Sequence, residues 1–209
     1  MNKIFFTSIL LSFLLSSYLF GDKLITKQLI NDAENKYGQM AKNRFNAIDK
    51  KLLEELKTAS IMKQLNTINS WYNFIKYKSD KKLYGINDYW ATLYEFTGKG
   101  MGDCEDYTIA KYYTLKEIGF DISRLKFTYV VYKDLRTGKK ISHMVLAYLK
   151  VSKPKSKKDI LILDNNNHLI LPASKRKDII KVVKMLNGDT GAKSKKWKQL
   201  EKDMKRKKL

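Results

Sequence analysis

The sequence predicts an α+β fold in which N-terminal helices and one cysteine-bearing helix pack on an antiparallel sheet. Two observations lead to this prediction. Apolar residues recur at helical spacing in three segments between residues 24 and 118, and three segments after residue 120 are typical of strands. The chain has 209 residues, of which 44% are hydrophobic, so it can bury a sizeable core. We therefore expect one domain after processing.

The N-terminus has the pattern of a secretory signal peptide. A basic residue, Lys3, precedes an apolar run from Ile4 to about Phe20, and Gly21 offers a small residue for cleavage. The run is barely long enough to cross a bilayer, so an uncleaved N-terminal anchor is the alternative. Since no second apolar span follows in the sequence, we expect export to the periplasm of a bacterial envelope.

Two helices are expected before residue 80. The first runs from Leu24 to Lys57 and places four apolar residues on one face: Ile48, Leu52, Leu53 and Leu56. The second runs from Ile61 to Tyr77, with apolar residues at positions 65, 68, 71, 72 and 75. The irregular, aromatic segment from Lys81 to Met101 is expected to be a loop.

A third helix should begin at Asp103 or Cys104 and end near Ile118, with Gly119 as its C-terminal cap. Its apolar residues cover most of its circumference, which is typical of a buried helix. Three strands should follow, with the sequences RLKFTYVVY, ISHMVLAYLKV and DILILD, separated by the turns DLRTGKK and SKPKSKK. The polar run after Asp164 is expected to end the sheet.

The charge is strongly positive, and much of it lies late in the chain. The net charge is +21, and lysine-rich runs include KSKKDI, SKRKDII and the last 17 residues. Such a positive charge is compatible with nucleic acid, anionic lipid or an acidic protein as a binding partner. It is equally compatible with a solvated surface that binds no partner. Export and the lack of RNP, helix-turn-helix or zinc-finger spacing argue against nucleic acid. We expect no nucleic-acid partner, and leave open a weak contact of the C-terminal segment with anionic lipid.

The stretch GKGMGDCEDY holds the only cysteine of the chain, Cys104. Exported proteins usually pair their cysteines in disulfides, which a single cysteine cannot do within one chain. A buried structural cysteine is the ordinary explanation. A helix N-terminus favours a thiolate, whereas the adjoining carboxylates oppose it. A reactive thiol at this position would therefore depend on a cation.

A histidine and an aspartate could complete a nucleophilic site. His143 lies in the second strand, whereas His168 follows three asparagines and is expected at the surface. If strands two and three form a hairpin centred near Lys153 or Pro154, His143 lies opposite Asp164, with Cβ atoms about 4.5–5.5 Å apart. A helix-start cysteine, a strand histidine and a strand-end aspartate can act as nucleophile, base and orienting group. The alternative is that His143 is a hydrogen-bonded residue of the core and that Asp164 only forms a turn.

Three stretches carry a family resemblance: YWATLYEFTGKGMGDCEDYTIAKYYTLKEIGF, SHMVLAYL and LILDNNN. With the motifs G-x-G-D-C-E-D, H-M-V-L and L-D-N, they resemble the bacterial transglutaminase-like cysteine proteinases, which are the LapG-type periplasmic proteases. The resemblance covers roughly Trp71 to Asn167. It implies a papain/transglutaminase-like fold, with Cys104 as nucleophile, His143 as general base and Asp164 as orienting residue.

The resemblance also implies a calcium cofactor and calcium-dependent activity. Members of this family bind calcium through acidic residues beside the nucleophile, and these match Asp103 and Glu105. Calcium takes six to eight oxygen ligands, so two carboxylates are only part of its shell. The alternative is a capped helix start, with Asp103 as N-cap and with Glu105 and Asp106 favouring the helix dipole. We assign Asp106 to the helix rather than to the metal.

The substrate implied by the resemblance is a large surface adhesin, cut near its N-terminus at a small-residue site containing paired alanines. Its release would loosen a biofilm. An inner-membrane receptor of the LapD type, which senses cyclic di-GMP, typically sequesters such an enzyme. The lysine-rich C-terminus and the basic turn KPKSKKD are departures from the family pattern, and a different surface could imply a different partner.

The expected organisation is a signal peptide at residues 1–21, one transglutaminase-like protease domain at 22–190 and a basic C-terminal tail at 191–209. Within the domain, residues 22–80 form the helical N-terminal part and residues 81–190 the catalytic core. Two alternatives remain open: transglutaminase or amidase chemistry by the same three residues, and a non-catalytic module that binds an acidic adhesin or a membrane.

Overall fold

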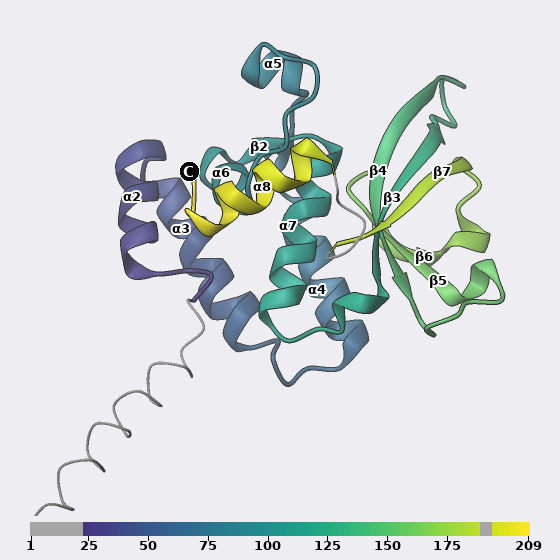
Figure 1. Cartoon of the computed structure of the whole chain (residues 1–209), viewed down its shortest axis with the longest axis horizontal. Helices are drawn as coiled ribbons and strands as arrows, with labels where there is room; N and C mark the ends of the chain where they lie inside the picture. Colours follow the sequence, from purple (N-terminus) through teal and green to yellow (C-terminus); the bar gives the residue numbers. More distant parts are fainter. Residues whose placement is uncertain (1–22, 189–193) are drawn as a thin grey trace, which may run out of the picture.

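The computed structural model describes residues 23–188 and 194–209. Helices form one half of the molecule and a five-stranded antiparallel sheet forms the other (Figure 1). This arrangement confirms the predicted α+β class. The proposed signal peptide lies outside the described residues. Within the described part of the chain, no helix combines the length and the hydrophobicity needed to cross a membrane.

The N-terminal helical part is more broken than predicted. Instead of one helix, the chain forms α2 (Lys27–Tyr37), α3 (Gln39–Ala47) and a π-helical segment (Ile48–Glu54). Gly38 separates α2 from α3 with a φ of 83°, a conformation that glycine adopts without steric cost. The four apolar residues predicted to share a face are all buried.

The second helix, α4 (Ile61–Asn73), ends earlier than predicted. Its N-cap is Ser60, whose hydroxyl accepts from the Lys63 backbone N–H. The next residues form the short strand β1 (Lys76–Tyr77), which pairs in parallel with β2 (Met101–Gly102). This pairing brings the segment after α4 alongside the chain that leads into Cys104.

The segment predicted to be a loop contains two short helices, α5 (Asp80–Tyr84) and α6 (Leu93–Lys99). A loop over residues 85–92 joins them. The prediction was wrong for both helices; α6 has Thr92 as its N-cap and Gly100 as its C-cap. Both helices are too short to show a clear helical periodicity.

The predicted third helix is confirmed as α7 (Cys104–Glu117), with Asp103 at its N-cap position and Gly119 at a φ of 81° after its end. It contacts α4 and α6 on one side and β4 on the other. Figure 1 shows α7 beside α4, and both helices contact the sheet, α7 through β4 and β5 and α4 through β5 and β6. The residue that begins α7 therefore lies where the two halves meet.

The sheet has the strand order β6-β5-β4-β3-β7, with every neighbouring pair antiparallel. Its strands are β3 (Leu125–Lys133), β4 (Lys140–Leu149), β5 (Ile160–Asp164), β6 (Asn167–Pro172) and β7 (Ile179–Asn187). Short 3-10 segments lie at Ile122–Arg124, Lys157–Asp159 and Ala173–Lys175. The three predicted strands are confirmed. The prediction that the sheet ends after Asp164 was wrong, since β6 and β7 follow.

One face of the sheet belongs to the main hydrophobic core, which it shares with the helices; its buried members include Leu125, Phe127, Met144, Leu146, Tyr148, Leu161 and Leu163. Val130, Val145, Ala147 and Ile162 form a second, smaller cluster. The alternation of these two sets along β4 fixes which side chains face the helices.

The predicted C-terminal tail, in its described part from residue 194 to 209, is not separate from the domain. Residues Lys195–Lys205 form helix α8, whose apolar residues Trp197, Leu200 and Met204 are 4%, 2% and 7% exposed and belong to the main core. Figure 1 shows α8 lying across the helical half, close to α6 and α7. The lysines that suggested a tail lie on the exposed side of this helix. The described part of the segment is therefore integral to the domain.

Candidate active site

Cys104 is the first residue of α7 and is partly buried. Its side chain lines a cleft of about 370 Å³ together with His143. The other lining residues are Tyr77, Tyr132, Asp134, Ile141, Ser142 and Asn166. The helix half thus supplies the thiol of this cleft and the sheet half supplies the imidazole.

His143 from β4 and Asp164 from the end of β5 form a buried pair, with 2.7 Å between Nε2 and Oδ1. The strand register differs from the predicted one by two residues, because Leu146 pairs with Leu163. A shift of two residues keeps every side chain on its original face. The imidazole and the carboxylate therefore still meet, along a diagonal of the sheet.

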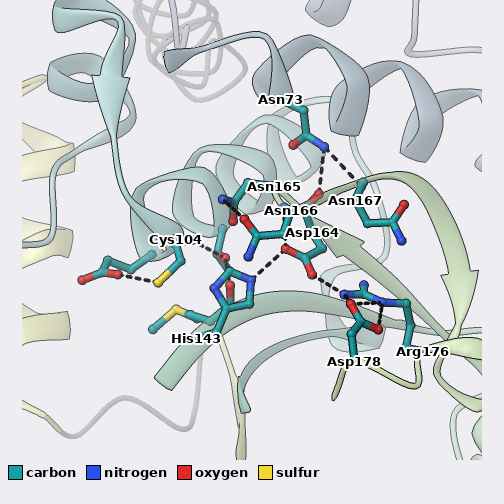
Figure 2. A network of polar contacts seen from close by, with 12 residues as sticks. Asn73, Cys104, His143, Asp164, Asn165, Asn166, Asn167, Arg176 and Asp178 are labelled. Carbon is teal, nitrogen blue, oxygen red and sulfur yellow. Dashed lines mark hydrogen bonds and ion pairs between the residues drawn. The ribbon is translucent and has the colours of Figure 1, made fainter. Parts of the chain in front are cut away.

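The remaining ring nitrogen of His143 lies on the Cys104 side of the ring (Figure 2). Helix α7 and strand β4 are joined beside it, since the Thr108 hydroxyl lies 2.8 Å from the Cys104 carbonyl and 3.3 Å from that of Met144. The structure thus brings together the three residues that the sequence selected.

The Cys104 thiol donates to Glu105 Oε2 at 3.0 Å. Burial, together with the charge and hydrogen bond of Glu105, raises the pKa of Cys104 well above its usual value, and Asp103 adds to this effect. The backbone N–H of Met144 acts in the opposite direction. The acidic neighbours therefore oppose thiolate formation, as the sequence suggested.

The turn after β5 holds Asp164 through both its backbone and its side chain. Asn73 donates through Nδ2 to the Asp164 carbonyl at 2.8 Å, and the Asn166 backbone N–H donates to Asp164 Oδ1 at 2.9 Å. Burial by itself would raise the pKa of Asp164, but the His143 hydrogen bond and the Arg176 charge keep it well below its usual value. The carboxyl is thus an ionised acceptor for the imidazole.

Sequence reasoning missed two polar partners of this site, Asn73 and Arg176 (Figure 2). Arg176 is 3% exposed and lies within the lysine-rich run SKRKDII. The neighbouring Asp178 was a usable signal, because an acidic residue two positions away can pair with a buried guanidinium. Asn73 gave no signal in the sequence.

An acidic cluster surrounds the start of α7. It contains the predicted pair Asp103 and Glu105, and three further carboxylates: Asp80, Asp88 and Asp106. In overlapping groups of three, one ligand atom of each residue lies within 4.8 Å of the others. Asp80 and Asp88 were not predicted, because they lie 23 and 15 residues before Asp103 and only the fold brings them close.

Two buried oxygens of this cluster, Asp80 Oδ1 and Asp103 Oδ1, have no hydrogen-bond partner in the described part of the chain. Burial raises the pKa of Asp80 to about 6, and burial with the neighbouring Glu105 raises that of Asp103 to about 7. Mutually repelling carboxylates with unpaired oxygens are the donor set that a hard cation such as calcium prefers. The residues present therefore fit a calcium ion.

Asp106 is fully buried, and both its oxygens accept backbone N–H groups, from Ala91 at 2.9 Å and from Asp103 at 3.1 Å. Its role in shaping the loop agrees with its assignment to the helix start. The packing around Asp106 also explains why position 102 of the motif is glycine. A Cβ at Gly102 would lie 2.5 Å from Asp106 Oδ2 and 2.6 Å from the Phe96 ring.

The comparisons with known proteins agree with this geometry. A family model described as bacterial transglutaminase-like cysteine proteinase matches residues 35–205. A comparison with curated protein sequences finds no match. Solved structures of Legionella pneumophila LapG are similar: the first is 34% identical, with a TM-score of 0.68 over 85% of this chain and 96% of that chain.

Two further LapG structures from the same organism match over 85% of this chain. The calcium-bound one is 31% identical, with a TM-score of 0.66 over 98% of its length, and the EGTA-treated one is 33% identical, with a TM-score of 0.68 over 96% of its length. The family match covers most of the sequence and extends through α8. The chain therefore belongs to the bacterial transglutaminase-like cysteine proteinases and is a cysteine protease of that family.

Proposed function

We propose that this protease is a calcium-dependent periplasmic endopeptidase that cuts the N-terminal region of a large surface adhesin. The observation that carries the proposal is the placement of Cys104 at the start of α7, in one cleft with the His143–Asp164 pair. Family membership supports the peptidase chemistry. The adhesin, the compartment and the control by calcium follow the family resemblance.

The three residues divide the reaction between them. The Cys104 thiol gives its proton to His143 Nδ1, and its sulfur forms a bond to the carbon of the scissile carbonyl. His143 then gives the proton to the leaving amine as the C–N bond breaks. Water, deprotonated by the same imidazole, hydrolyses the thioester and restores the thiol. Asp164 accepts from His143 Nε2 throughout and so fixes the tautomer.

The start of α7 also provides a hydrogen-bond donor for the oxyanion of the reaction. The backbone N–H of Cys104 is one of the first four N–H groups of the helix, which have no partner within it. Such a donor, aided by the helix dipole, stabilises the negative oxygen of the tetrahedral intermediate. We assign this N–H as one oxyanion donor.

Calcium would be held by Asp103 and Glu105, with Asp80 and Asp88 as further carboxylate ligands. When bound, it supplies positive charge beside the thiol. The calcium-bound and EGTA-treated structures of the related LapG support calcium as the cation. Without a cation, the crowded carboxylates keep Cys104 protonated and in contact with Glu105.

The shape of the cleft supports a substrate with small residues at the cut. Tyr77 and Tyr132 line the cleft with Cys104 and His143, so bulky side chains beside the scissile bond would meet these rings. The more specific site, with paired alanines in an adhesin, follows the family resemblance. The proposed periplasmic location rests on the N-terminal segment, and sequestration by a cyclic-di-GMP-sensing inner-membrane receptor of the LapD type would then control access to the adhesin.

The exposed side of α8 is basic, with Lys195, Lys198, Lys202 and Lys205 at its surface. A weak contact of this surface with anionic lipid would be consistent with a membrane-bound receptor as partner. It is secondary to the proteolytic role.

The test uses the signal-less protein and the N-terminal fragment of a large secreted adhesin from the same organism. We expect one cut with calcium, no cut with excess chelator, and no cut by Cys104→Ala in calcium. His168→Gln, which alters the exposed histidine, should cut normally. Amide transfer or cross-links in place of two peptides would indicate transglutaminase chemistry. An uncut fragment that is still bound equally by Cys104→Ala would indicate a binding module.

A further inference from the structure

Arg176 is a buried cation that bridges two carboxylates. Its Nη2 lies 2.6 Å from Asp164 Oδ2 and 2.6 Å from Asp178 Oδ2, and its Nε lies 2.8 Å from Asp178 Oδ1 (Figure 2). The contact with Asp178 is bidentate, a geometry that fixes the plane of the guanidinium. Arg176 is therefore held rigidly on one side while it touches Asp164 on the other.

The support behind Arg176 is itself fixed by strand pairing. Asp178 directly precedes β7, and its carbonyl accepts the backbone N–H of Lys133 at 2.8 Å. Arg176 follows the 3-10 segment Ala173–Lys175 and donates its backbone N–H to the Ala173 carbonyl. The guanidinium thus fixes the end of β5, where Asp164 lies, relative to β3 and β7.

Asp164 has a separate partner for each oxygen. Oδ1 accepts from His143 and from the Asn166 backbone, and Oδ2 accepts from Arg176. Without Arg176, Oδ2 would be a buried anionic oxygen with no donor, and the carboxylate could rotate to share its two oxygens among the remaining donors. Rotation would move Oδ1 away from the His143 ring.

We propose that Arg176 is a positioning residue: by clamping Asp164 Oδ2, it keeps Oδ1 on His143 and so directs the imidazole at Cys104. This inference rests on the proposed function, because it concerns the same catalytic residues. It differs from a structural ion pair that only ties β7 to β5. A structural pair would affect folding stability without changing the orientation of His143.

The critical variant is Arg176→Gln, and Arg124→Gln is its matched control. Arg124 also ties parts of the sheet together, donating to the carbonyls of Leu149 and Lys150, but it contacts none of the three catalytic residues. Both variants should lose stability. Only Arg176→Gln should lower kcat, by up to about 100-fold with KM within about twofold, since a small misplacement of a catalytic group has effects of this size.

A second measurement needs no substrate. In a His168→Gln background, His143 is the single histidine, so NMR of the ring N–H reports the Nε2 hydrogen bond directly. We expect this signal in the parent and in Arg124→Gln, and its loss through exchange with water in Arg176→Gln. If Arg176→Gln does not fold, Arg176→Lys replaces it, with an expected several-fold loss of kcat and a shifted signal, because an ammonium cannot make the bidentate contact.

The inference is overturned if a folded Arg176 variant keeps both the parent kcat and the parent His143 signal while losing stability as Arg124→Gln does. Failure of the proposed function looks different. In that case the parent cuts no adhesin, yet the His143 signal still shows whether Arg176 orients the ring.

Discussion

At the scale of single residues, Lys111 illustrates how deeply the polar network reaches into the core. It lies in the middle of α7 and is 1% exposed, and its Nζ lies 2.8 Å from Asn69 Oδ1 and 2.8 Å from Asn73 Oδ1. Asn73 in turn holds the turn that carries Asp164. The helix that carries the nucleophile is thereby linked to the turn that carries the orienting carboxylate.

Burial lowers the pKa of Lys111 to about 7 from an unfolded value of 10.5. Between these two pH values the unfolded chain binds one proton more than the folded chain, so stability contributed through Lys111 rises with pH. Below pH 7 both states are protonated, and this dependence disappears. We predict that from pH 7 to 9.5 the parent gains stability relative to Lys111→Met, on the order of 3 kcal/mol.

Urea unfolding of both proteins at several pH values measures this difference, and the subtraction removes the titration of the other lysines. Lys116→Met, in the same helix, is the control for the loss of a lysine from α7. Parallel pH profiles for the parent and Lys111→Met would show that Lys111 stays protonated in the folded protein over this range.

The catalytic candidates could be selected from the sequence because each had a distinctive position. Cys104 was the single cysteine at a helix start, His143 was the strand histidine, and Asp164 ended the next strand. Asn73 could not be selected, because helix surfaces contain many such residues, and the one signal for Arg176 was Asp178 two positions away, which does not point to Asp164. Only the pairing of distant strands and helices makes them neighbours of Asp164.

At the scale of elements, α8 is the helix that was hardest to recognise from the sequence, because its composition is rich in lysine. Its Trp197 ring packs against Phe127 at 4.9 Å and Trp90 at 6.2 Å between ring centroids. Beyond the helix, the Lys208 carbonyl accepts from the Thr92 hydroxyl at 2.5 Å. The C-terminal segment thereby fixes the loop that carries Asp88 of the acidic cluster.

We predict that Trp197→Ala destabilises the protein by about 3–5 kcal/mol, as is typical when a buried aromatic residue is deleted from a core. Lys198→Ala, on the exposed side of the same helix, should change stability by no more than about 0.5 kcal/mol. Equilibrium unfolding in urea compares the two. Similar small losses for both variants would mean that α8 contributes little to the fold.

The prediction of helices and strands succeeded where the apolar residues had a strong periodicity. It failed where other features of the sequence determined the structure. Helix α7 and strands β3, β4 and β5 follow their apolar patterns. The apolar spacing at Trp197, Leu200 and Met204 is also helical, but a surrounding run of lysines obscured it. The break at Gly38 depends on one positive φ, and β6 and β7 carry mostly exposed residues that give no alternating pattern.

At the scale of the whole molecule, the site depends on how the two halves meet. Cys104 comes from the helical half, whereas His143 and Asp164 come from the sheet. The acidic cluster belongs to the helical half, at the thiol. The alignment of the halves therefore decides whether the imidazole can activate the thiol, which is the central claim of the proposed mechanism.

Alkylation of the calcium-loaded protein by iodoacetamide at pH 7 tests this claim most directly, because Cys104 is the only thiol and no substrate is needed. We predict that the parent and His168→Gln react at equal rates and that His143→Gln reacts at least about tenfold more slowly, since loss of the base lowers the thiolate fraction. Equal rates for all three proteins would contradict the claim that His143 activates Cys104.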